Sequence, residues 1–205
     1  MAMTRRKAMT AHEFLGRWPE PPDPAVRARR ARQQEERRRR ELEYKRAEEP
    51  LLAELRSVGW EVGSVWDLVN IDVAYPQAHP VLARHLVRPY PPVIRDGIAR
   101  ALAVRSAIFA WDVVREQYLT ERDEYVRQGL AAALAAMVDR AHLDDLLVLL
   151  RDRRHGTSRV ILLRGLQRLR DPRARAALEE LADDPDLKKQ IGIILHRRHL
   201  RQSHP

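Results

Sequence analysis

VIRDGIARAL (residues 93–102), YVRQGLAAAL (125–134) and TSRVILLRGL (157–166) align without gaps and recur at a period of 32 residues. A fourth segment, DLKKQIGIIL (186–195), follows the third after 29 residues. With Ser158 as the exception, the segments place small or aliphatic residues at the i, i+4, i+7 and i+8 spacing of a helix that faces a core. A fixed period of about 20 to 50 residues is typical of solenoids. The stretch from Ile94 to Leu195 therefore predicts an α-solenoid.

The composition agrees with an all-α fold. The chain has 205 residues, of which 44% are apolar and only 5% aromatic, and alanine, leucine and arginine favour helices over strands. It contains no cysteine, which excludes disulfides, thiolate catalysis and cysteine-based zinc or iron–sulfur sites. We find neither the apolar core of a signal peptide nor an apolar stretch of about 18–20 residues. We therefore expect a cytoplasmic protein that does not enter a membrane.

The chain is expected to divide into four regions. Residues 1–24 are predicted to be a disordered tail, and residues 25–49 a charged helical extension with ten basic and six acidic residues. Residues 50–199 form the solenoid, in which residues 50–74 cap the first repeat, because an end repeat must cover its apolar face. Residues 200–205 are expected to fray. Pro50 is expected to break or restart the helix at the boundary.

The solenoid is expected to consist of about four helix pairs. The predicted first helices include residues 79–89, 108–119 and 142–151, and the predicted second helices include residues 93–104, 123–137 and 187–199. Asp171 followed by Pro172 predicts the start of another helix, because Asp is a good N-cap and proline suits the first turn. Phe109 is expected to face inward or partly inward.

The segment DPRARAALEELADDPD (171–186) and the repeated second-helix pattern resemble HEAT-like repeats of the small bacterial type, which were first grouped with phycobilisome lyases. The resemblance covers about residues 75–199. It implies a right-handed superhelix of antiparallel helix pairs, whose second helices line a concave face that binds other proteins. Members of this family differ in function, so the resemblance alone does not choose a function.

A cation recurs at the third position of the aligned segments, as Arg95, Arg127, Arg159 and Lys188. In a solenoid these residues would form a row with a spacing of about 10 Å. The favoured interpretation is a structural ladder that bridges to acidic residues in neighbouring turns, such as Asp123 or Asp152. The other interpretation is a basic stripe that faces an acidic partner.

Two groups of cations are candidates for partner binding. The predicted second helices carry four that point away from the core, namely Arg100, Arg164, Arg168 and Lys189. The extension carries an uninterrupted basic block of Arg37, Arg38, Arg39 and Arg40, which glutamates flank. The net charge of +9 invites a nucleic-acid interpretation. However, 34 of the 38 basic residues are arginine, a bias that a GC-rich genome also produces.

We expect a non-enzymatic scaffold or adaptor that binds a protein partner through its concave face and basic arm. A partner with an acidic surface would suit these arginines. The alternative is a nucleic-acid- or ribonucleoprotein-associated protein that uses the same arginines. A third hypothesis, an enzyme, requires a pocket with clustered titratable groups. No phosphate-binding loop, Ser-His-Asp set or paired carboxylates stand out, and no cofactor or metal is predicted. The oligomeric state is left open.

Overall fold

The computed structural model describes residues 23–202, whose regular structure is entirely helical. The prediction of an all-α fold is thus confirmed for this part of the chain. The chain divides into two compact units, residues 1–43 and residues 44–205. None of the described helices is both long enough and apolar enough to cross a bilayer.

In the first unit, the described residues belong to the amino-terminal part of α2 (Pro24–Ser57). Their side chains are exposed apart from the half-buried Val26, because residues 24–43 carry almost no apolar side chains to bury. Arg39 and Glu43, one turn apart, form an ion pair of 3.1 Å that supports the helix. This part of α2 is therefore a solvated, highly charged helix.

Pro50 lies inside α2, so the expectation that it breaks the helix is wrong. Proline in a helix interior removes one backbone hydrogen bond and costs about 3 kcal/mol. The residues that follow repay that cost, because Leu51 and Leu55 are fully buried in the second unit. Glu48, one turn earlier on the same helix, accepts a hydrogen bond of 2.6 Å from the backbone nitrogen of Val65.

The described part of the second unit continues with nine further α-helices and three 3-10 turns. The first set is α3 (Val65–Asn70), η1 (Pro76–Ala78), α4 (His79–Leu86), α5 (Pro92–Ala101), η2 (Arg105–Ala110) and α6 (Trp111–Thr120). The second set is α7 (Glu124–Met137), α8 (Leu143–Arg151), η3 (Arg153–Ser158), α9 (Arg159–Arg168), α10 (Pro172–Glu180) and α11 (Lys188–Gln202). The predicted start of α10 is confirmed, because Asp171 accepts from the backbone of Arg173 and Pro172 occupies the first turn.

Phe109 does not face the core. It lies in η2, where its side chain is 59% exposed, so the expectation of an inward phenylalanine is wrong. Residues 108–110 of the predicted α-helix belong instead to the 3-10 turn η2, which has three residues per turn and therefore changes which residues share a face. Ala107 and Ala110 are the residues of η2 that are buried.

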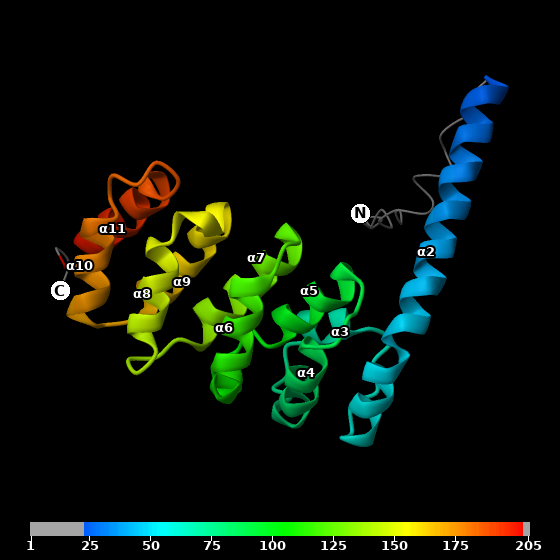
Figure 1. Ribbon diagram of the computed structural model, residues 1–205, viewed down its shortest axis with the longest axis horizontal. Coiled ribbons are helices and arrows are strands. Elements are labelled where there is room, and N and C mark those ends of the chain that lie inside the picture. The colour runs from blue at the N-terminus through cyan, green and yellow to red at the C-terminus, as the bar shows by residue number, and fades with distance from the viewer. Residues whose placement is uncertain (1–22, 203–205) are drawn as a thin grey trace, which may run out of the picture. The chain divides into compact units, whose positions relative to one another are not determined.

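The second helices of successive pairs contact one another. α3 contacts α5, α5 contacts α7, α7 contacts α9, and α9 contacts α11, and Figure 1 shows α5, α7 and α9 side by side. Glycines allow the helices to approach closely. A Cβ atom on Gly97 would lie 3.0 Å from the Trp66 indole nitrogen on α3, and one on Gly165 would lie 2.8 Å from Val138. A single apolar core runs from Leu51 to Ile194 beneath these helices.

Candidate binding surface

Equivalent positions of the repeated segments lie on three neighbouring helices. The eighth position is Arg100 on α5, Ala132 on α7 and Arg164 on α9. α7 contacts both α5 and α9, so Ala132 lies on the helix between the two that carry the arginines. The axes of packed helices are roughly 10 Å apart. Arg100 and Ala132 are half-buried and Arg164 is exposed.

One accessible side of α7 is formed by two alanines, a glutamine and a tyrosine. Tyr125, Gln128, Ala132 and Ala136 are three or four residues apart, so they share one face of the helix. Tyr125 is 72% exposed at the amino-terminal end of this face, and the other three are half-buried. We call this face the α7 strip. Its two alanines have small side chains, and the ring of Tyr125 lies at its amino-terminal end.

Arg100 does not present a free charge. Its Nε donates a hydrogen bond of 2.8 Å to Asp96, one turn earlier on α5. Burial raises the pKa of the Asp96 carboxyl, and the neighbouring Arg100 charge opposes that rise. The two side chains therefore largely neutralise each other, and Arg100 contributes less to a basic surface than its position suggests.

Arg168 binds the end of α7. Its Nη2 donates to the backbone carbonyl oxygens of Ala135 and Ala136, the latter over 2.8 Å. These carbonyls belong to the last turn of α7, where the helix dipole favours a cation. Partial burial lowers the pKa of Arg168, and the charge of Arg105 lowers it further. Two arginines therefore lie close enough to repel each other at this point.

Arg105 was not predicted from the sequence. It is the exposed first residue of η2, a turn that packs against α7, and it belongs to no column of the 32-residue period. Arg140 and Arg170 occupy the comparable turns after α7 and α9 and are also exposed. We call Arg105, Arg140, Arg168 and Arg170 the arginine edge. Arg168 is the last residue of α9, and the other three lie two to four residues beyond the carboxyl-terminal ends of second helices. Nearness to a helix end, rather than a column of the period, is the signal that could have found them.

The arginine edge makes no close ion pair within the described residues, although the charge of Arg140 contributes to the lowered pKa of Asp171. None of its four side chains forms an ion pair with a residue of the described part of the chain. The acidic residues of the same turns already have partners. Asp139 contacts the His142 ring over 2.7 Å, and Asp171 pairs with Arg173 over 3.1 Å. The edge thus has unused capacity for anionic groups.

The ladder arginines lie beneath the surface. Arg95 forms an ion pair of 2.5 Å with Glu121, and Arg127 donates over 2.6 Å to the backbone carbonyl of the same residue. Arg127 also pairs with Glu124 over 3.3 Å. Both arginines therefore hold the turn between α6 and α7, and their side chains are only 20% exposed.

Arg159 has acidic partners in the turn before α11, where it pairs with Asp184 over 2.8 Å. The suggested partners Asp123 and Asp152 serve other roles, since Asp123 caps α7 and Asp152 binds Arg154. Lys188 is exposed and has no ion pair within residues 23–197. The column is therefore a set of turn contacts at three positions and a solvated cation at the fourth.

The remaining predicted residues are exposed. Lys189 lies in the first turn of α11 and is solvated. Arg37, Arg38, Arg39 and Arg40 lie on α2 in the first unit, and each is exposed. Their four consecutive positions point around the whole helix rather than to one side.

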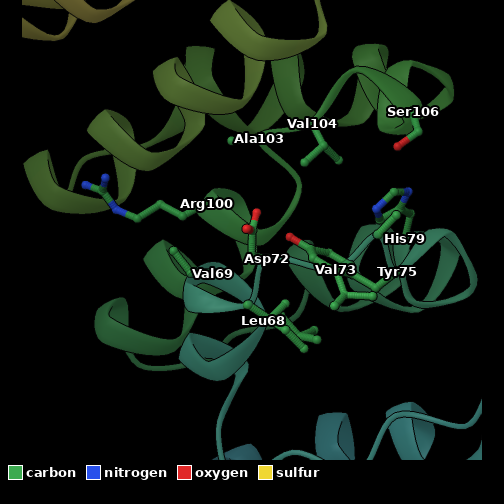
Figure 2. A pocket seen from close by; sticks show the side chains of 12 residues that line it. Leu68, Val69, Asp72, Val73, Tyr75, His79, Arg100, Ala103, Val104 and Ser106 are labelled. Atoms are coloured by element: carbon green, nitrogen blue, oxygen red, sulfur yellow. The ribbon is translucent and has the colours of Figure 1, made fainter.

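A pocket of about 440 Å³ lies in the second unit beside Arg100 (Figure 2). It is lined by α3, by the irregular link before η1, by the start of α4 and by the chain from the end of α5 to η2; its residues are Leu68, Val69, Ile71, Asp72, Val73, Ala74, Tyr75, His79, Arg100, Ala103, Val104 and Ser106. Sequence reasoning missed it because most of the lining comes from links rather than from periodic helices. Among the described side chains, those of residues 23–197, no three His, Asp or Glu residues gather in a way that could hold a metal ion.

Comparisons with protein-family models, with curated proteins and with solved structures yield no match for this chain.

Proposed function

We propose that the chain is a non-enzymatic scaffold that binds an acidic segment of a protein partner across α5, α7 and α9. We further propose that residues 50–199 form a right-handed superhelix of HEAT-like helix pairs that acts in the cytoplasm. The 32-residue period and the successive contacts from α3 to α11 support this architecture. In such a superhelix the second helices share one accessible face.

The observation that carries the proposal is the pair Arg105 and Arg168 at the end of α7. Both are cations, they repel each other, and neither has a carboxylate partner among the described residues. An acidic side chain placed between them would relieve the repulsion and accept charge-assisted hydrogen bonds. Carbonyl oxygens of Ala135 and Ala136 meet only part of the donor capacity of Arg168, because a guanidinium has five N–H donors.

The α7 strip supplies the apolar part of the same surface. Ala132 and Ala136 are small, so a partner's backbone can approach the helix closely, and Tyr125 offers the kind of large rigid side chain that is enriched in interfaces. The strip leads from Tyr125 to the carboxyl-terminal end of α7, where Arg105 and Arg168 lie. A segment with apolar and acidic residues therefore suits this surface.

Nucleic acid is the alternative partner, because phosphates also bind arginine. The block Arg37 to Arg40 would then contribute. In the first unit, however, Arg37 to Arg40 point around the whole helix and are flanked by Glu36 and Glu41, so they present no continuous basic stripe. On the α5–α7–α9 surface the position between Arg100 and Arg164 is Ala132. Tyr125 is the one aromatic residue of the α7 strip, whereas single-stranded nucleic acid is bound by several stacking groups in succession.

The test is fluorescence anisotropy of a labelled oligo-glutamate peptide and of a labelled DNA duplex with the full chain. Arg105→Gln should weaken peptide binding about fivefold, the upper range for an exposed ion pair, and Arg168→Lys should weaken it less because it keeps the charge. Arg122→Gln is the matched control. Arg122 is an exposed arginine in the turn at the opposite, amino-terminal end of α7, so its loss should leave the affinity unchanged.

Two results would overturn the proposal. One is peptide binding that Arg105→Gln and Arg122→Gln weaken equally, which would indicate only general attraction to a basic protein. The other is duplex binding that is tighter than peptide binding, falls steeply with salt and is lost when Arg37 to Arg40 are changed to glutamine. That second result would establish the nucleic-acid alternative.

A further inference from the structure

The pocket beside Arg100 has properties opposite to those of the arginine edge. Figure 2 shows Asp72 on one side of it and His79 and Ser106 on the other, with Tyr75 between them. Leu68, which is 1% exposed, belongs to its apolar wall. The pocket therefore combines a carboxylate at one end, polar neutral groups at the other and an apolar surface between.

Asp72 is the uncompensated charge of this pocket. The residue is exposed, and its carboxylate makes no hydrogen bond or ion pair with another described residue. Arg100 is the second charged lining residue, but it is paired with Asp96, and its guanidinium points away from the pocket in Figure 2. In a chain with a net charge of +9, this is a local negative site that is complementary to a cation.

His79 supplies an unused hydrogen-bonding group. Its residue is 2% exposed, it lines the pocket, and its ring forms no hydrogen bond with the described residues. Burial lowers the pKa of His79, so the ring is neutral near pH 7 and does not repel a cation. A neutral ring that lines the pocket and makes no hydrogen bond with the described residues can donate to or accept from a bound group.

The wall between these two ends suits a methylene chain. The ring of Tyr75 is 6% exposed and packs edge-on against His79, with ring centroids 5.2 Å apart. The Tyr75 hydroxyl already donates to the carbonyl of Ala101 over 2.9 Å, so only the apolar body of the side chain is available. Long cationic side chains bury their stems on such surfaces while the charged head stays near water.

We infer that this pocket binds a lysine side chain of the partner segment. The ammonium group pairs with Asp72, the methylene stem lies along Leu68 and Tyr75, and the peptide group at the other end faces His79 and Ser106. The compact ammonium suits a single carboxylate, whereas a guanidinium favours a bidentate, planar arrangement. Ser106 directly follows Arg105 in η2, so acidic residues that flank the lysine would lie toward the arginine edge. The inference rests on the proposal that the chain binds a protein segment.

The test is a titration of the isotope-labelled full chain with Nα-acetyl-lysine methylamide, followed by amide chemical shifts. The shifts should move in residues 71–75 and at Ser106. The norleucine analogue has the same stem without the charge and should bind about threefold to fivefold more weakly, as expected for one exposed ion pair. Asp72→Asn should abolish that difference. Asp183→Asn, at an exposed and unpaired aspartate of the link before α11, should preserve it.

Three results would overturn the inference. The first is the absence of shifts at the pocket, and the second is equal affinity of the lysine and norleucine probes. The third is that n-butylammonium binds as tightly as the lysine probe, which would assign the pocket to a free amine. The outcome is distinguishable from that of the oligo-glutamate experiment. That experiment uses a probe of opposite charge and depends on Arg105 and Arg168, so either result can fail while the other succeeds.

Discussion

Arg159 and Asp184 form a buried ion pair that joins α9 to the turn before α11. Their atoms Nη2 and Oδ2 lie 2.8 Å apart, and the two side chains are 0% and 4% exposed. The Nε of Arg159 also donates over 2.7 Å to the carbonyl of Leu150 at the end of α8. The Arg159 guanidinium lowers the pKa of Asp184. One arginine therefore links α8, α9 and the turn before α11.

Arg159→Ala should lower the free energy of unfolding by about 3–5 kcal/mol, because it leaves the Asp184 carboxylate buried without its main partner. Urea unfolding followed by circular dichroism measures this change. Arg154→Ala is the control, since the Arg154 side chain is 88% exposed in its pair with Asp152 and should contribute at most about 1 kcal/mol. A loss of similar size in both variants would contradict a special role for the buried pair.

Two glycines on different helices should respond to alanine with opposite signs. A Cβ atom on Gly129 of α7 would collide with the carboxylate of Asp96 on α5 and lie 3.2 Å from its backbone oxygen, whereas one on Gly192 of α11 meets nothing within 4 Å. We expect Gly129→Ala to destabilise the protein by about 1–3 kcal/mol through overpacking. Gly192→Ala should stabilise it by about 0.5–1 kcal/mol, because alanine favours the helix. Thermal unfolding of both variants measures the contrast, and equal signs would refute the close contact of α5 and α7.

Stability should fall as the pH drops below about 6.5. The pKa values of His79, His85 and His155 are lowered, in each case mainly by burial. Below the pKa of an ordinary histidine the unfolded chain takes up protons while the folded chain resists them. The stabilisation is therefore fully present above about pH 6.5 and is lost as the pH falls through the lower folded values. Urea unfolding at a series of pH values measures the slope.

Other groups act on the same pH range and define the controls. Glu54 lies 2.9 Å from the His85 ring and opposes its shift, and Asp152 does the same for His155. Glu48 has a raised pKa, mainly through burial, so its effect has the opposite sign, but at lower pH. His155→Phe should reduce the slope near pH 6, while a substitution of the exposed His196 should not. An unchanged slope in His155→Phe would contradict the assignment.

The helices could be predicted because their burial follows the sequence period. Ile94, Ile98, Leu102 and their counterparts such as Leu134 and Leu166 are all buried, as a core-facing spacing of apolar residues requires. The start of α10 was predictable for a local reason, the Asp171–Pro172 pair. The superhelix and its HEAT-like character stay proposals, since they depend on relations between repeats that a local pattern does not specify.

The candidate site was less predictable, because it depends on contacts between distant segments. Arg168 was a candidate, but its contact with the α7 carbonyls joins residues about one repeat apart. Arg105 and Asp72 lie in links, where no period identifies them. Phe109 was expected to face the core but is exposed, because a 3-10 turn replaces the start of the expected α-helix. The partner role of Arg37 to Arg40 remains a prediction.

Pro50 offers a direct test of how tertiary packing overrides local propensity. It lies within α2, where it cannot donate the backbone hydrogen bond that position would otherwise give to the carbonyl of Arg46. The helix continues because Leu51, Leu52 and Leu55 are buried immediately after it. Pro50→Ala restores the donor and removes the ring, so it should raise the free energy of unfolding by about 1–3 kcal/mol. Urea unfolding measures the change. Ala53→Pro, which places a proline one turn further on, is the opposite control and should destabilise the protein. If Pro50→Ala destabilises the chain instead, then the proline stabilises this junction, and a continuous α2 through Pro50 is contradicted.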